Sequence, residues 1–444
     1  MKIHQIYDKG LAHASYAVVS KGEMAVVDPA RDPQPYYDFA RDQQAKIVAV
    51  IETHPHADFI SSHLEIHQHT GATIYASSKI GALYPHKGFD KGDSLKIGEL
   101  TLEAYNTPGH SPDSISILVM DKEGQQHSIF TGDTLFVGDV GRPDLREKGG
   151  EMESMREHLA RQMYHSTRNV LMQLERDVLV YPAHGAGSLC GKNLSTDLSS
   201  TIGRELDTNY ALQEMPEEKF VNNLLEDQPF IPKYFKNSVE LNKRGAAPFK
   251  ESIAKVTRLT ADEKLEEGVL IIDSRDQLQY KNAHLPGSVN LMDGLKFETW
   301  LGSIVGPDEP FYLIADDEET LESLIRKSAK IGYEGNIKGA MVADKPGEAH
   351  SRFLNLEHFK ANKDGYHILD VRNAGEVQEG KIFEQAQAIP LHELRERAGE
   401  VPVDKPVMVH CAAGYRSAAG FSILENLLPD AVVYDLGEAI KEFK

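Results

Sequence analysis

Apolar and polar positions alternate in blocks along the first 194 residues. Short β-rich runs at residues 46–52, 100–106, 128–130 and 178–181 each end in a cluster of polar side chains. The loops between these runs are rich in His, Asp, Gly and Pro. Because strands supply rigidity and loops supply chemical groups, the pattern predicts a layered α/β domain with functional side chains on loops at one sheet edge.

The pattern changes after residue 194. Residues 195–245 favour helices, and Gly245-Ala246-Ala247-Pro248 predicts a linker because Gly loosens the backbone and Pro breaks regular structure. A second region begins near Ser252 and contains a diverged repeat, since the segment 269–275 is echoed at 367–372. We therefore expect three domains: residues 1–245 with a helical extension from about 195, residues 252–345, and residues 350–444.

Ligand-type side chains follow several of the predicted strands. His54, His56 and Asp58 stand together in the segment THPHAD, where strand alternation turns the two imidazoles to the same side. Three further strand-then-loop segments carry His110, Asp133 and His184. A single such His is more often a surface or hydrogen-bonded residue, but the repeated context predicts one shared metal site.

A second pair of histidines imitates a metal motif. His63 and His67 are four positions apart in a predicted helix, as in zinc proteases, but Glu65 stands one place too late for that motif. We expect these two side chains on a solvated helix face.

The larger set resembles the metallo-β-lactamase superfamily, whose His-x-His-x-Asp-His signature is followed by further His, Asp and His ligands. That resemblance implies an αββα sandwich. The chain departs from the signature at Phe59, which follows Asp58 where a second metal would find a histidine. Because a phenyl ring cannot bind a metal, Phe59 argues against a dinuclear zinc site.

Within that superfamily, the segments 107–110 and 130–136, followed by Gly-Arg-Pro-Asp at 141–144, resemble the persulfide dioxygenases. The resemblance implies one Fe(II) per chain, bound by His54, His110 and Asp133. Two imidazoles and one carboxylate leave three positions open on one face for a thiolate-type substrate and O₂.

The same resemblance implies roles for the neighbouring polar residues. His56, Asp58 and His184 are expected to orient the ligands or to hold water. Arg142 is expected to contact an anionic substrate, with an ion pair inside the loop as the alternative.

A cysteine stands between a predicted strand and a predicted helix near residue 411. Small residues let the loop Cys411-Ala412-Ala413-Gly414-Tyr415-Arg416 curl so that backbone N–H groups point at the sulfur. The helix dipole and Arg416 favour the thiolate, which predicts a catalytic nucleophile rather than a buried structural cysteine. The loop resembles that of the rhodaneses, which holds a persulfide, and is one residue tighter than the tyrosine phosphatase loop.

The first repeat also resembles a rhodanese, through Asp273-Ser274-Arg275 and the segment 283–290. Its loop position is acidic, and we expect Asp316 in place of the cysteine. A carboxylate cannot accept sulfane sulfur, and the acidic run repels thiosulfate and sulfite. This domain is expected to be a catalytically silent spacer or docking surface.

Composition narrows the class of partner. The 444 residues include 68 acidic and 48 basic side chains, and the net charge of −20 disfavours nucleic acid and anionic membranes. No apolar signal segment follows Met1 and no run approaches a membrane span, so we expect a cytoplasmic protein.

The two cysteines, Cys190 and Cys411, favour free thiols in a reducing compartment, although a disulfide is formally possible. Cys190 follows His184 in a Gly-rich loop. It is either a buried small residue or a thiol that faces the metal pocket and relays sulfane sulfur.

Together these features predict a persulfide dioxygenase joined to a sulfurtransferase. The resemblance implies oxidation of a low-molecular-weight thiol persulfide with O₂ to sulfite, with Cys411 exchanging sulfane sulfur to form or use thiosulfate, and a homo-oligomer. The direction of that exchange and the thiol carrier stay open. The alternatives are a glyoxalase II-type zinc thioester hydrolase whose rhodanese domains only bind, and a scaffold that senses persulfides through Cys411.

Overall fold

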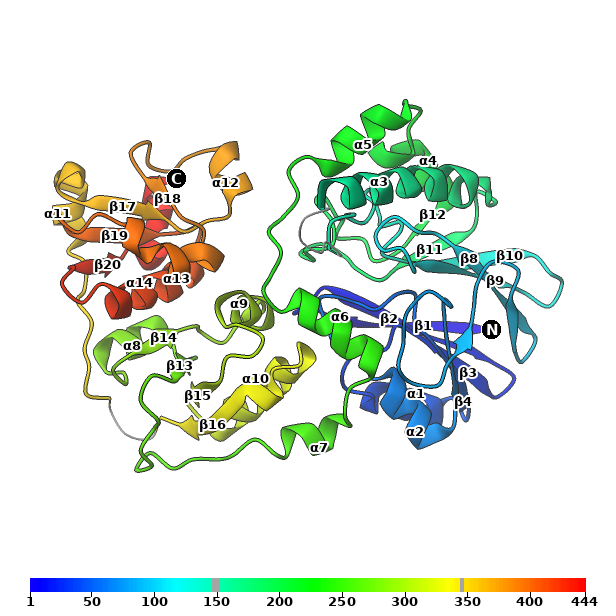
Figure 1. The fold of residues 1–444 in the computed structure, drawn as a ribbon, viewed down its shortest axis with the longest axis horizontal. Helices are drawn as coiled ribbons and strands as arrows, with labels where there is room; N and C mark the ends of the chain where they lie inside the picture. The colour runs from blue at the N-terminus through cyan, green and yellow to red at the C-terminus, as the bar shows by residue number, and fades with distance from the viewer. Residues whose placement is uncertain (146–151, 344–346) are drawn as a thin grey trace. The chain divides into compact units, whose positions relative to one another are not determined.

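The computed structural model describes residues 1–145, 152–343 and 347–444. The chain divides into two compact units, Met1–Glu251 with Lys330–Gly332, and Ser252–Ala329 with Tyr333–Lys444 (Figure 1). The division at Ser252 coincides with the predicted start of the second region. The predicted end of the first rhodanese-like domain, at residue 345, lies outside the described residues.

The first unit contains two six-stranded sheets. The first sheet follows chain order: β1 (Lys2–Asp8), β2 (His13–Ser20), β3 (Glu23–Val27), β4 (Lys46–Ile51), β5 (Thr73–Ala76) and β6 (Lys87–Gly88). The second sheet also follows chain order: β7 (Ser94–Ile97), β8 (Leu100–Asn106), β9 (Ile115–Met120), β10 (Gln126–Gly132), β11 (Leu179–Pro182) and β12 (Ser200–Thr201).

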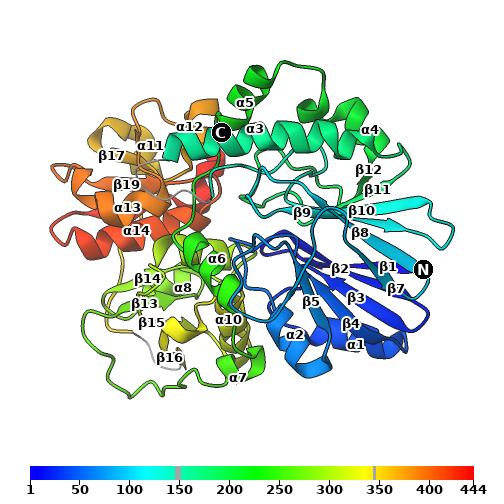
Figure 2. The same ribbon diagram turned by 45° about the vertical axis from the view of Figure 1, so that its right-hand side comes forward.

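The two sheets pack face to face, with helices on the outer faces (Figure 2). The first sheet is covered by α1 (Gln34–Asp42) and α2 (His63–Thr70), and the second by α3 (Met152–Asn169), α4 (Ile202–Thr208) and α5 (Glu217–Leu225). Apolar side chains from both sheets, such as Val18, Ile51, Leu102 and Ile117, fill the space between them. This arrangement confirms the predicted αββα sandwich.

Strand β8 illustrates why the sequence folds in this way. Leu100, Leu102 and Ala104 are buried, whereas Thr101 and Glu103 are partly exposed, which is the period of two that a half-buried strand requires. The predicted helical region after residue 195 contains α4, α5 and α6 (Phe235–Arg244), and α7 (Phe249–Ile253) follows the linker.

The second unit contains two four-stranded sheets in which all paired strands are parallel. The first has the order β14 (Ser288–Asn290), β13 (Leu270–Asp273), β15 (Phe311–Ala315), β16 (Ile337–Val342), and the second has the order β18 (Gln387–Ala388), β17 (His367–Asp370), β19 (Val407–His410), β20 (Val433–Asp435). Because the two orders are equivalent, the sequence repeat corresponds to a repeated domain.

Helices surround both parallel sheets. They are α8 (Gln277–Asn282), α9 (Phe297–Ile304), α10 (Glu318–Lys330), α11 (Leu356–Ala361), α12 (Ala374–Glu379), α13 (Leu394–Arg397) and α14 (Tyr415–Leu427).

A polar contact joins the two domains of this unit: Lys281 Nζ lies 2.7 Å from Asp435 Oδ2, and both side chains are buried. Breaking a buried ion pair of this kind leaves an uncompensated charge, which disfavours separation of the two side chains.

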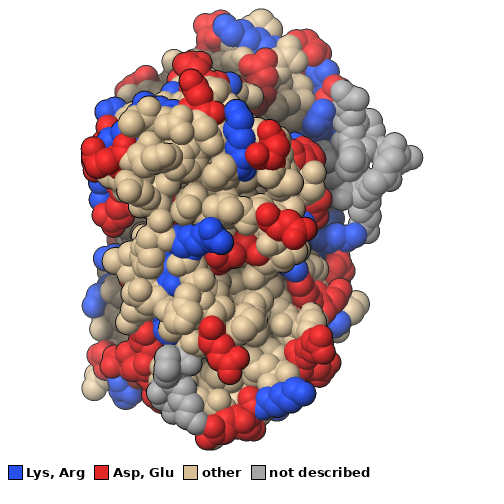
Figure 3. All heavy atoms as spheres, turned by 90° about the vertical axis from the view of Figure 1, so that its left-hand side faces the viewer, with Lys and Arg blue, Asp and Glu red and all other residues tan. Residues whose placement is uncertain are grey.

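Within the described parts of the chain, no helix is both long and apolar enough to cross a membrane. Figure 3 shows one face of the molecule, on which acidic and basic side chains are interspersed among neutral ones. Among the residues drawn in colour, this face carries no continuous basic stripe of the kind that follows a nucleic-acid backbone.

Candidate functional site

The candidate site of the first unit lies where several strands end. His54 follows β4 of the first sheet, while His110, Asp133 and His184 follow β8, β10 and β11 of the second. These side chains therefore meet only because the two sheets pack against each other.

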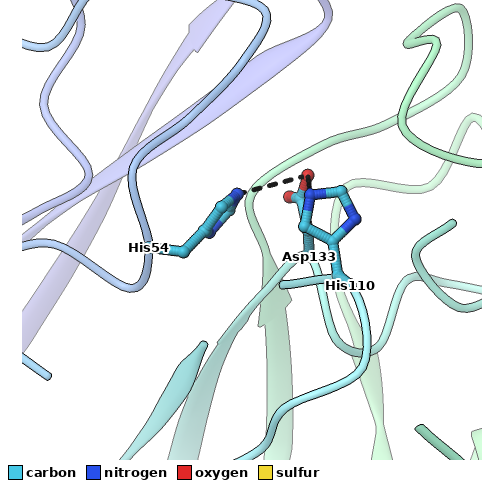
Figure 4. A group of neighbouring side chains, drawn as sticks. All are labelled: His54, His110 and Asp133. Atoms are coloured by element: carbon cyan, nitrogen blue, oxygen red, sulfur yellow. Dashed lines mark ion pairs between the residues drawn. The ribbon is translucent and has the colours of Figure 1, made fainter. Parts of the chain in front are cut away.

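His54, His110 and Asp133 converge on one point (Figure 4). The Nε2 atoms of His54 and His110 lie 3.8 Å and 3.4 Å from Oδ2 of Asp133. One ligand atom from each residue lies within 4.8 Å of the others, and all three side chains are buried. Oδ2 of Asp133 accepts no hydrogen bond from any described residue. Because a buried carboxylate oxygen requires a partner, this arrangement suits a cation.

The orientation of His54 is set by Thr53 and Asp28. The backbone N–H of Thr53 donates to Oδ1 of Asp28 at 2.7 Å, and its hydroxyl donates to Oδ2 at 2.8 Å. Nδ1 of His54 lies 3.0 Å from the same hydroxyl oxygen. Since the hydroxyl proton is directed to the carboxylate, the oxygen accepts from Nδ1–H, and Nε2 of His54 presents its lone pair toward Asp133.

His184 connects Asp133 to Asp58. Its Nδ1 lies 2.8 Å from Oδ1 of Asp133, and its Nε2 lies 2.7 Å from Oδ2 of Asp58. Burial by itself lowers the pKa of His184, but the two carboxylates outweigh it and raise that pKa well above its ordinary value. Burial raises the pKa of Asp133, yet the neighbouring imidazoles of His184, His110 and His54 hold that pKa well below its ordinary value. Asp133 is therefore a carboxylate held by His184.

His56 and Phe59 form the next layer. The ring centroid of His56 lies 4.1 Å from that of His54, and its Nε2 lies 3.2 Å from Oδ1 of Asp28. Phe59 is buried, with its ring centroid 4.4 Å from that of His56 and 3.8 Å from that of His13. An apolar ring thus stands beside the imidazoles where the superfamily signature has a metal ligand.

Cys190 lies in the same cluster. Its sulfur and the ligand atoms of Asp58 and His184 are within 4.8 Å of one another. Burial and then the carboxylates of Asp58 and Asp133 raise the pKa of Cys190 well above its ordinary value, so the side chain is a protonated thiol. The structure places Cys190 beside Asp58 and His184, and its role as a sulfur relay stays a prediction.

Arg142 links the segment after Asp133 to the loop of Cys190. Its side chain is 1% exposed, its Nε and Nη2 donate to Asp144 at 2.6 Å and 2.7 Å, and its Nη1 donates to the carbonyl of Leu189 at 3.1 Å. The structure thus shows an ion pair between Arg142 and Asp144 inside the loop, which was the alternative to a contact with substrate. Contact with an anionic substrate stays a prediction.

The structure corrects the expectation for His63. This side chain is buried rather than solvated, with Nδ1 3.5 Å from Oε1 of Glu52 and its ring centroid 4.5 Å from that of Tyr84. Burial and the neighbouring His56 lower the pKa of His63 to about 3. The spacing along a helix cannot reveal that a distant segment, here the one with Tyr84, covers that face.

The second candidate site is the loop between β19 and α14. Cys411 is buried, and the N–H of Gly414 donates to its sulfur at 3.1 Å. Gly414 has φ of 104°, and a Cβ there would lie 3.1 Å from the backbone nitrogen of Glu438, so the tight loop requires glycine.

Arg416 stands in the first turn of α14 and is paired with Glu376. Its Nη2 donates to Oε1 of Glu376 at 2.7 Å, and its Nη1 donates to the other oxygen. Burial by itself lowers the pKa of Arg416, but Glu376 outweighs it and raises that pKa. The guanidinium therefore remains charged beside the loop that carries Cys411.

Comparison with known families agrees with these two sites. The metallo-beta-lactamase superfamily model matches residues 8–184, and the rhodanese-like domain model matches residues 257–343 and 355–444. A crystal structure of a metallo-beta-lactamase from Staphylococcus aureus subsp. aureus COL is 32% identical, covers 77% of this chain and 99% of its own, and has a TM-score of 0.70. The chain belongs to the metallo-beta-lactamase superfamily. Its metallo-beta-lactamase domain is followed by rhodanese-like domains.

The metallo-beta-lactamase domain is similar to two kinds of curated enzyme. The cytoplasmic hydroxyacylglutathione hydrolase of Arabidopsis thaliana is 35% identical over 179 residues, which are 38% of this chain and 62% of the relative. The mitochondrial persulfide dioxygenase of Homo sapiens is 26% identical over 164 residues, which are 36% of this chain and 59% of the relative. The chain thus spans less than two thirds of either relative.

The register of the rhodanese-like domains corrects one assignment. Asp273 pairs with Ile314, as Asp370 pairs with His410, and the N–H groups of Ser274 and Val371 donate to the carbonyls of Ile314 and His410. The counterpart of Cys411 is therefore Ala315, and Asp316 stands one place later than expected. A methyl group carries no nucleophile, so Ala315 rather than Asp316 explains why we expect this domain to be silent.

The sequence pattern did not single out Asp28. This residue accepts hydrogen bonds from Thr53, whose hydroxyl in turn orients His54. The signal was present: Val26-Val27-Asp28-Pro29 is another apolar run that ends in a carboxylate. Its importance is visible only in the metallo-beta-lactamase sandwich, where β3 and β4 are paired neighbours.

Proposed function

We propose that the metallo-beta-lactamase domain is an iron-dependent persulfide dioxygenase and that the Cys411 domain is a sulfurtransferase. The observation that carries the proposal is the buried set of His54, His110 and Asp133, whose ligand atoms lie within 4.8 Å of one another. The similarity to the human persulfide dioxygenase supports the substrate class.

The residues fit one ferrous ion. Oδ2 of Asp133 is buried, accepts no hydrogen bond from the described residues, and faces the Nε2 atoms of His54 and His110. Two imidazoles and one carboxylate are the donor set of non-heme Fe(II) oxygenases. When bound, iron would supply adjacent open positions for O₂ and for the terminal sulfur of a thiol persulfide.

Buried neighbours of the triad hold its side chains in orientation. Asp28 and Thr53 keep Nε2 of His54 directed at Asp133, while His184 fixes the other oxygen of Asp133. Because ligands held by buried partners cannot turn away, the donor set is preorganised. Phe59 adds a buried apolar ring beside His56 and His184.

The proposed oxidation is balanced with water as co-reactant. A persulfide R–S–S–H, O₂ and water give the thiol R–SH and sulfite. The sulfur–sulfur bond breaks, three S–O bonds form on the released sulfur, and that sulfur loses the four electrons that O₂ gains. Two protons accompany the sulfite dianion.

A groove beside the ligand loops suits the carrier of the persulfide. It has a volume of about 560 Å³ and is lined by Asp113, which follows His110 by three residues, and by Asp144, the partner of Arg142. Its other polar lining residues include Lys79, Lys233, Lys236 and Lys243, together with Glu240. Because lysines outnumber acidic residues in this groove, we propose a carrier with anionic groups.

Lys236 tests the groove. The substitution Lys236→Glu should raise KM for a negatively charged carrier persulfide several-fold and leave kcat nearly unchanged, since the residue lines the groove and is not one of the three proposed ligands. Lys122→Glu, on an exposed side chain outside the groove, is the matched control. Equal KM values for the two variants would exclude the groove as the carrier site.

The Cys411 domain fits sulfane sulfur transfer. The Cys411 thiolate attacks the outer sulfur of thiosulfate, the sulfur–sulfur bond breaks, and sulfite leaves while a cysteine persulfide forms. In the reverse step sulfite attacks that persulfide, which releases thiosulfate and the thiolate. Sulfite is therefore a compound common to both proposed reactions. Together they would be the later steps of sulfide oxidation, after a separate two-electron oxidation has converted sulfide into a persulfide.

The deciding experiment measures metal content and O₂ uptake of the full chain. We expect one iron per chain and O₂ uptake that requires a thiol persulfide. His110→Ala should abolish uptake and leave transfer from thiosulfate intact, and an unfolding curve like that of the unmodified chain should show that the unit with His110 is folded. Two zinc ions per chain with thioester hydrolysis and no O₂ uptake would overturn the proposal.

A thioester hydrolase is the second candidate, because the Arabidopsis thaliana hydroxyacylglutathione hydrolase is 35% identical over the matched region. Phe59 opposes it, since hydrolysis of this type generally uses two metals and the ring removes one expected ligand. The same measurements of metal and product separate the two candidates.

A further inference from the structure

Helix α14, which begins in the loop of Cys411, lies along β14, an edge strand of the first rhodanese-like domain (Figure 1). Oγ of Ser422 accepts from the backbone N–H of Asn290 at 2.8 Å, and Nδ2 of Asn426 donates to the carbonyl of Ser288 at 2.8 Å. The helix that follows the cysteine loop is therefore attached to the first repeat as well as to its own domain.

Tyr415, the residue before Arg416, is bound to the same domain. Its hydroxyl donates to the carbonyl of Met292 at 2.8 Å. Gly294 lies against its ring, since a Cβ there would be 3.2 Å from Cε2 of Tyr415, which is closer than ordinary packing. The segment 292–294 thus holds the first residue of α14, and a shift of this segment would move Arg416.

The guanidinium of Arg416 is restrained from two sides. Glu376 accepts from its Nη1 and Nη2, while its Cζ lies over the ring of Trp300 at 5.8 Å from the centroid. Trp300 belongs to α9 of the first rhodanese-like domain and is buried. An indole face attracts a cation, and the attraction grows when water is excluded. Glu376 therefore restrains the nitrogens, and Trp300 restrains the central carbon.

Arg416 and Cys411 belong to one tight loop. The N–H of Gly414 donates to the sulfur at 3.1 Å. Burial lowers the pKa of Arg416, whereas Glu376 and then Cys411 raise it. Because a fixed cation raises the local concentration of anions, the position of Arg416 decides how well an anionic sulfur compound approaches the sulfur.

We propose that the first rhodanese-like domain is part of the Cys411 site, with Trp300 as a positioning residue for Arg416 and Met292 as the anchor of the loop through Tyr415. The proposal rests on the proposed sulfurtransferase function and assigns a role to a domain that has no cysteine of its own. A positioned Arg416 favours dianions such as thiosulfate and sulfite over neutral sulfur compounds.

Alkylation of Cys411 in the full chain tests the proposal without turnover. The thiolate displaces iodide from iodoacetate, an anion, or from iodoacetamide, which is neutral and of nearly the same size. Both rates are measured at one pH on the peptide that contains Cys411, by mass spectrometry. The thiolate fraction and the access to the sulfur affect both rates alike, so the ratio of the two rates reports the cation beside the sulfur.

Removal of the indole should lower this ratio. Trp300→Leu should reduce the preference for iodoacetate about three- to fivefold, which is the strength of a cation–π contact, and Trp300→Phe should largely restore it. Arg416→Ala sets the lower limit of the ratio. Phe297→Leu is the matched control, because Phe297 is also buried in α9 but the guanidinium lies over Trp300.

Tyr415→Phe tests the anchor separately, because it loses only the hydroxyl that donates to Met292. It should lower the same ratio. In steady-state transfer from thiosulfate, Trp300→Leu should raise KM more than it lowers kcat, and O₂ uptake should not change. A general loss of structure would instead change the rates with both reagents and leave their ratio as it was.

The proposal would be overturned by an unchanged ratio in Arg416→Ala or in a folded Trp300→Leu, or by an equal fall in Phe297→Leu. If Trp300→Leu did not fold, an unchanged ratio in Tyr415→Phe would overturn it. If the unmodified chain transferred no sulfur while the ratio fell as expected, the sulfurtransferase function would fail and the role of Trp300 in positioning Arg416 would stand.

Discussion

Replacing Thr53 with valine removes the hydroxyl that orients His54, the proposed iron ligand, and leaves His54 itself unchanged. Valine has nearly the shape of threonine but lacks the hydroxyl, which accepts from His54 at 3.0 Å and donates to Asp28 at 2.8 Å. The backbone N–H of residue 53 still donates to Asp28 at 2.7 Å, so the loop keeps its main anchor. The substitution therefore frees the imidazole to turn without opening the fold.

The magnitude follows from the two hydrogen bonds that are lost. The bond to the charged carboxylate contributes about 1.5–3 kcal/mol and the bond to the neutral imidazole about 0.5–1.5 kcal/mol, so the free energy of unfolding should fall by about 2–4.5 kcal/mol. Loss of a ligand's orienting partner typically weakens metal binding about 10–100-fold. We expect Thr53→Val to weaken iron binding within that range.

The assay is competition for Fe(II) between the chain and a chelator, measured without oxygen, together with urea unfolding. Thr167→Val is the control, because its buried hydroxyl donates to two carbonyls of its own helix, α3, and accepts from Arg168 of the same helix. The control should lose stability but keep its iron affinity. If Thr53→Val bound iron as tightly as the unmodified chain, or if both variants weakened binding equally, the chain from Asp28 to His54 would not orient the ligand.

Three further predictions concern other parts of the chain. Cys411→Ser should abolish sulfur transfer between thiosulfate and thiols and leave O₂ uptake largely intact, because the thiol lies outside the unit that carries the proposed metal site. Loss of both activities in a folded, iron-loaded variant would contradict this prediction. Gly141→Ala would place a Cβ 1.9 Å from the carbonyl oxygen of Asp133, so the affinity for iron in the same chelator assay should fall about tenfold or more. Gly335→Ala is the control, because its Cβ would have nothing within 4 Å, and it should leave the affinity unchanged. Burial by itself raises the pKa of Glu376, but Arg416 outweighs burial, and the pKa in the folded state is lowered. The ion pair therefore stabilises the folded state fully above the unfolded pKa of about 4.3. This contribution is lost as the pH falls through the lowered pKa of the folded state. Glu376→Gln should flatten the acid limb of an unfolding curve measured against pH, and an unchanged limb would show that the pair contributes nothing.

The sequence by itself determined the architecture and the identity of the candidate ligands. The alternation of residues such as Leu100, Leu102 and Ala104 specifies a strand locally, because side chains of successive residues point to opposite faces. The same local reasoning placed His54 and Asp133 at strand ends. It also located the repeat near Asp273 and Asp370, which the equivalent strand orders of the two domains bear out.

Only the tertiary structure decided which side chains share an environment. His63 is buried because the segment of Tyr84 covers its helix, and Arg142 is an internal ion pair because Asp144 turns back upon it. The contact of His63 is not visible in the local pattern, and the ion pair of Arg142 was one of two alternatives there, since periodicity reports which way a side chain points but not what lies opposite.

The two cysteine loops show the same division. Cys411 was recognisable from its strand-to-helix context. Its counterpart in the first repeat, Ala315, could be identified only from the pairing of the parallel strands. The register of that pairing depends on hydrogen bonds between distant segments. The grouping of Cys190 with Asp58 and His184 likewise joins loops from two sheets. Sequence spacing determines the conformation of each loop, whereas the packing of the sheets determines which loops meet.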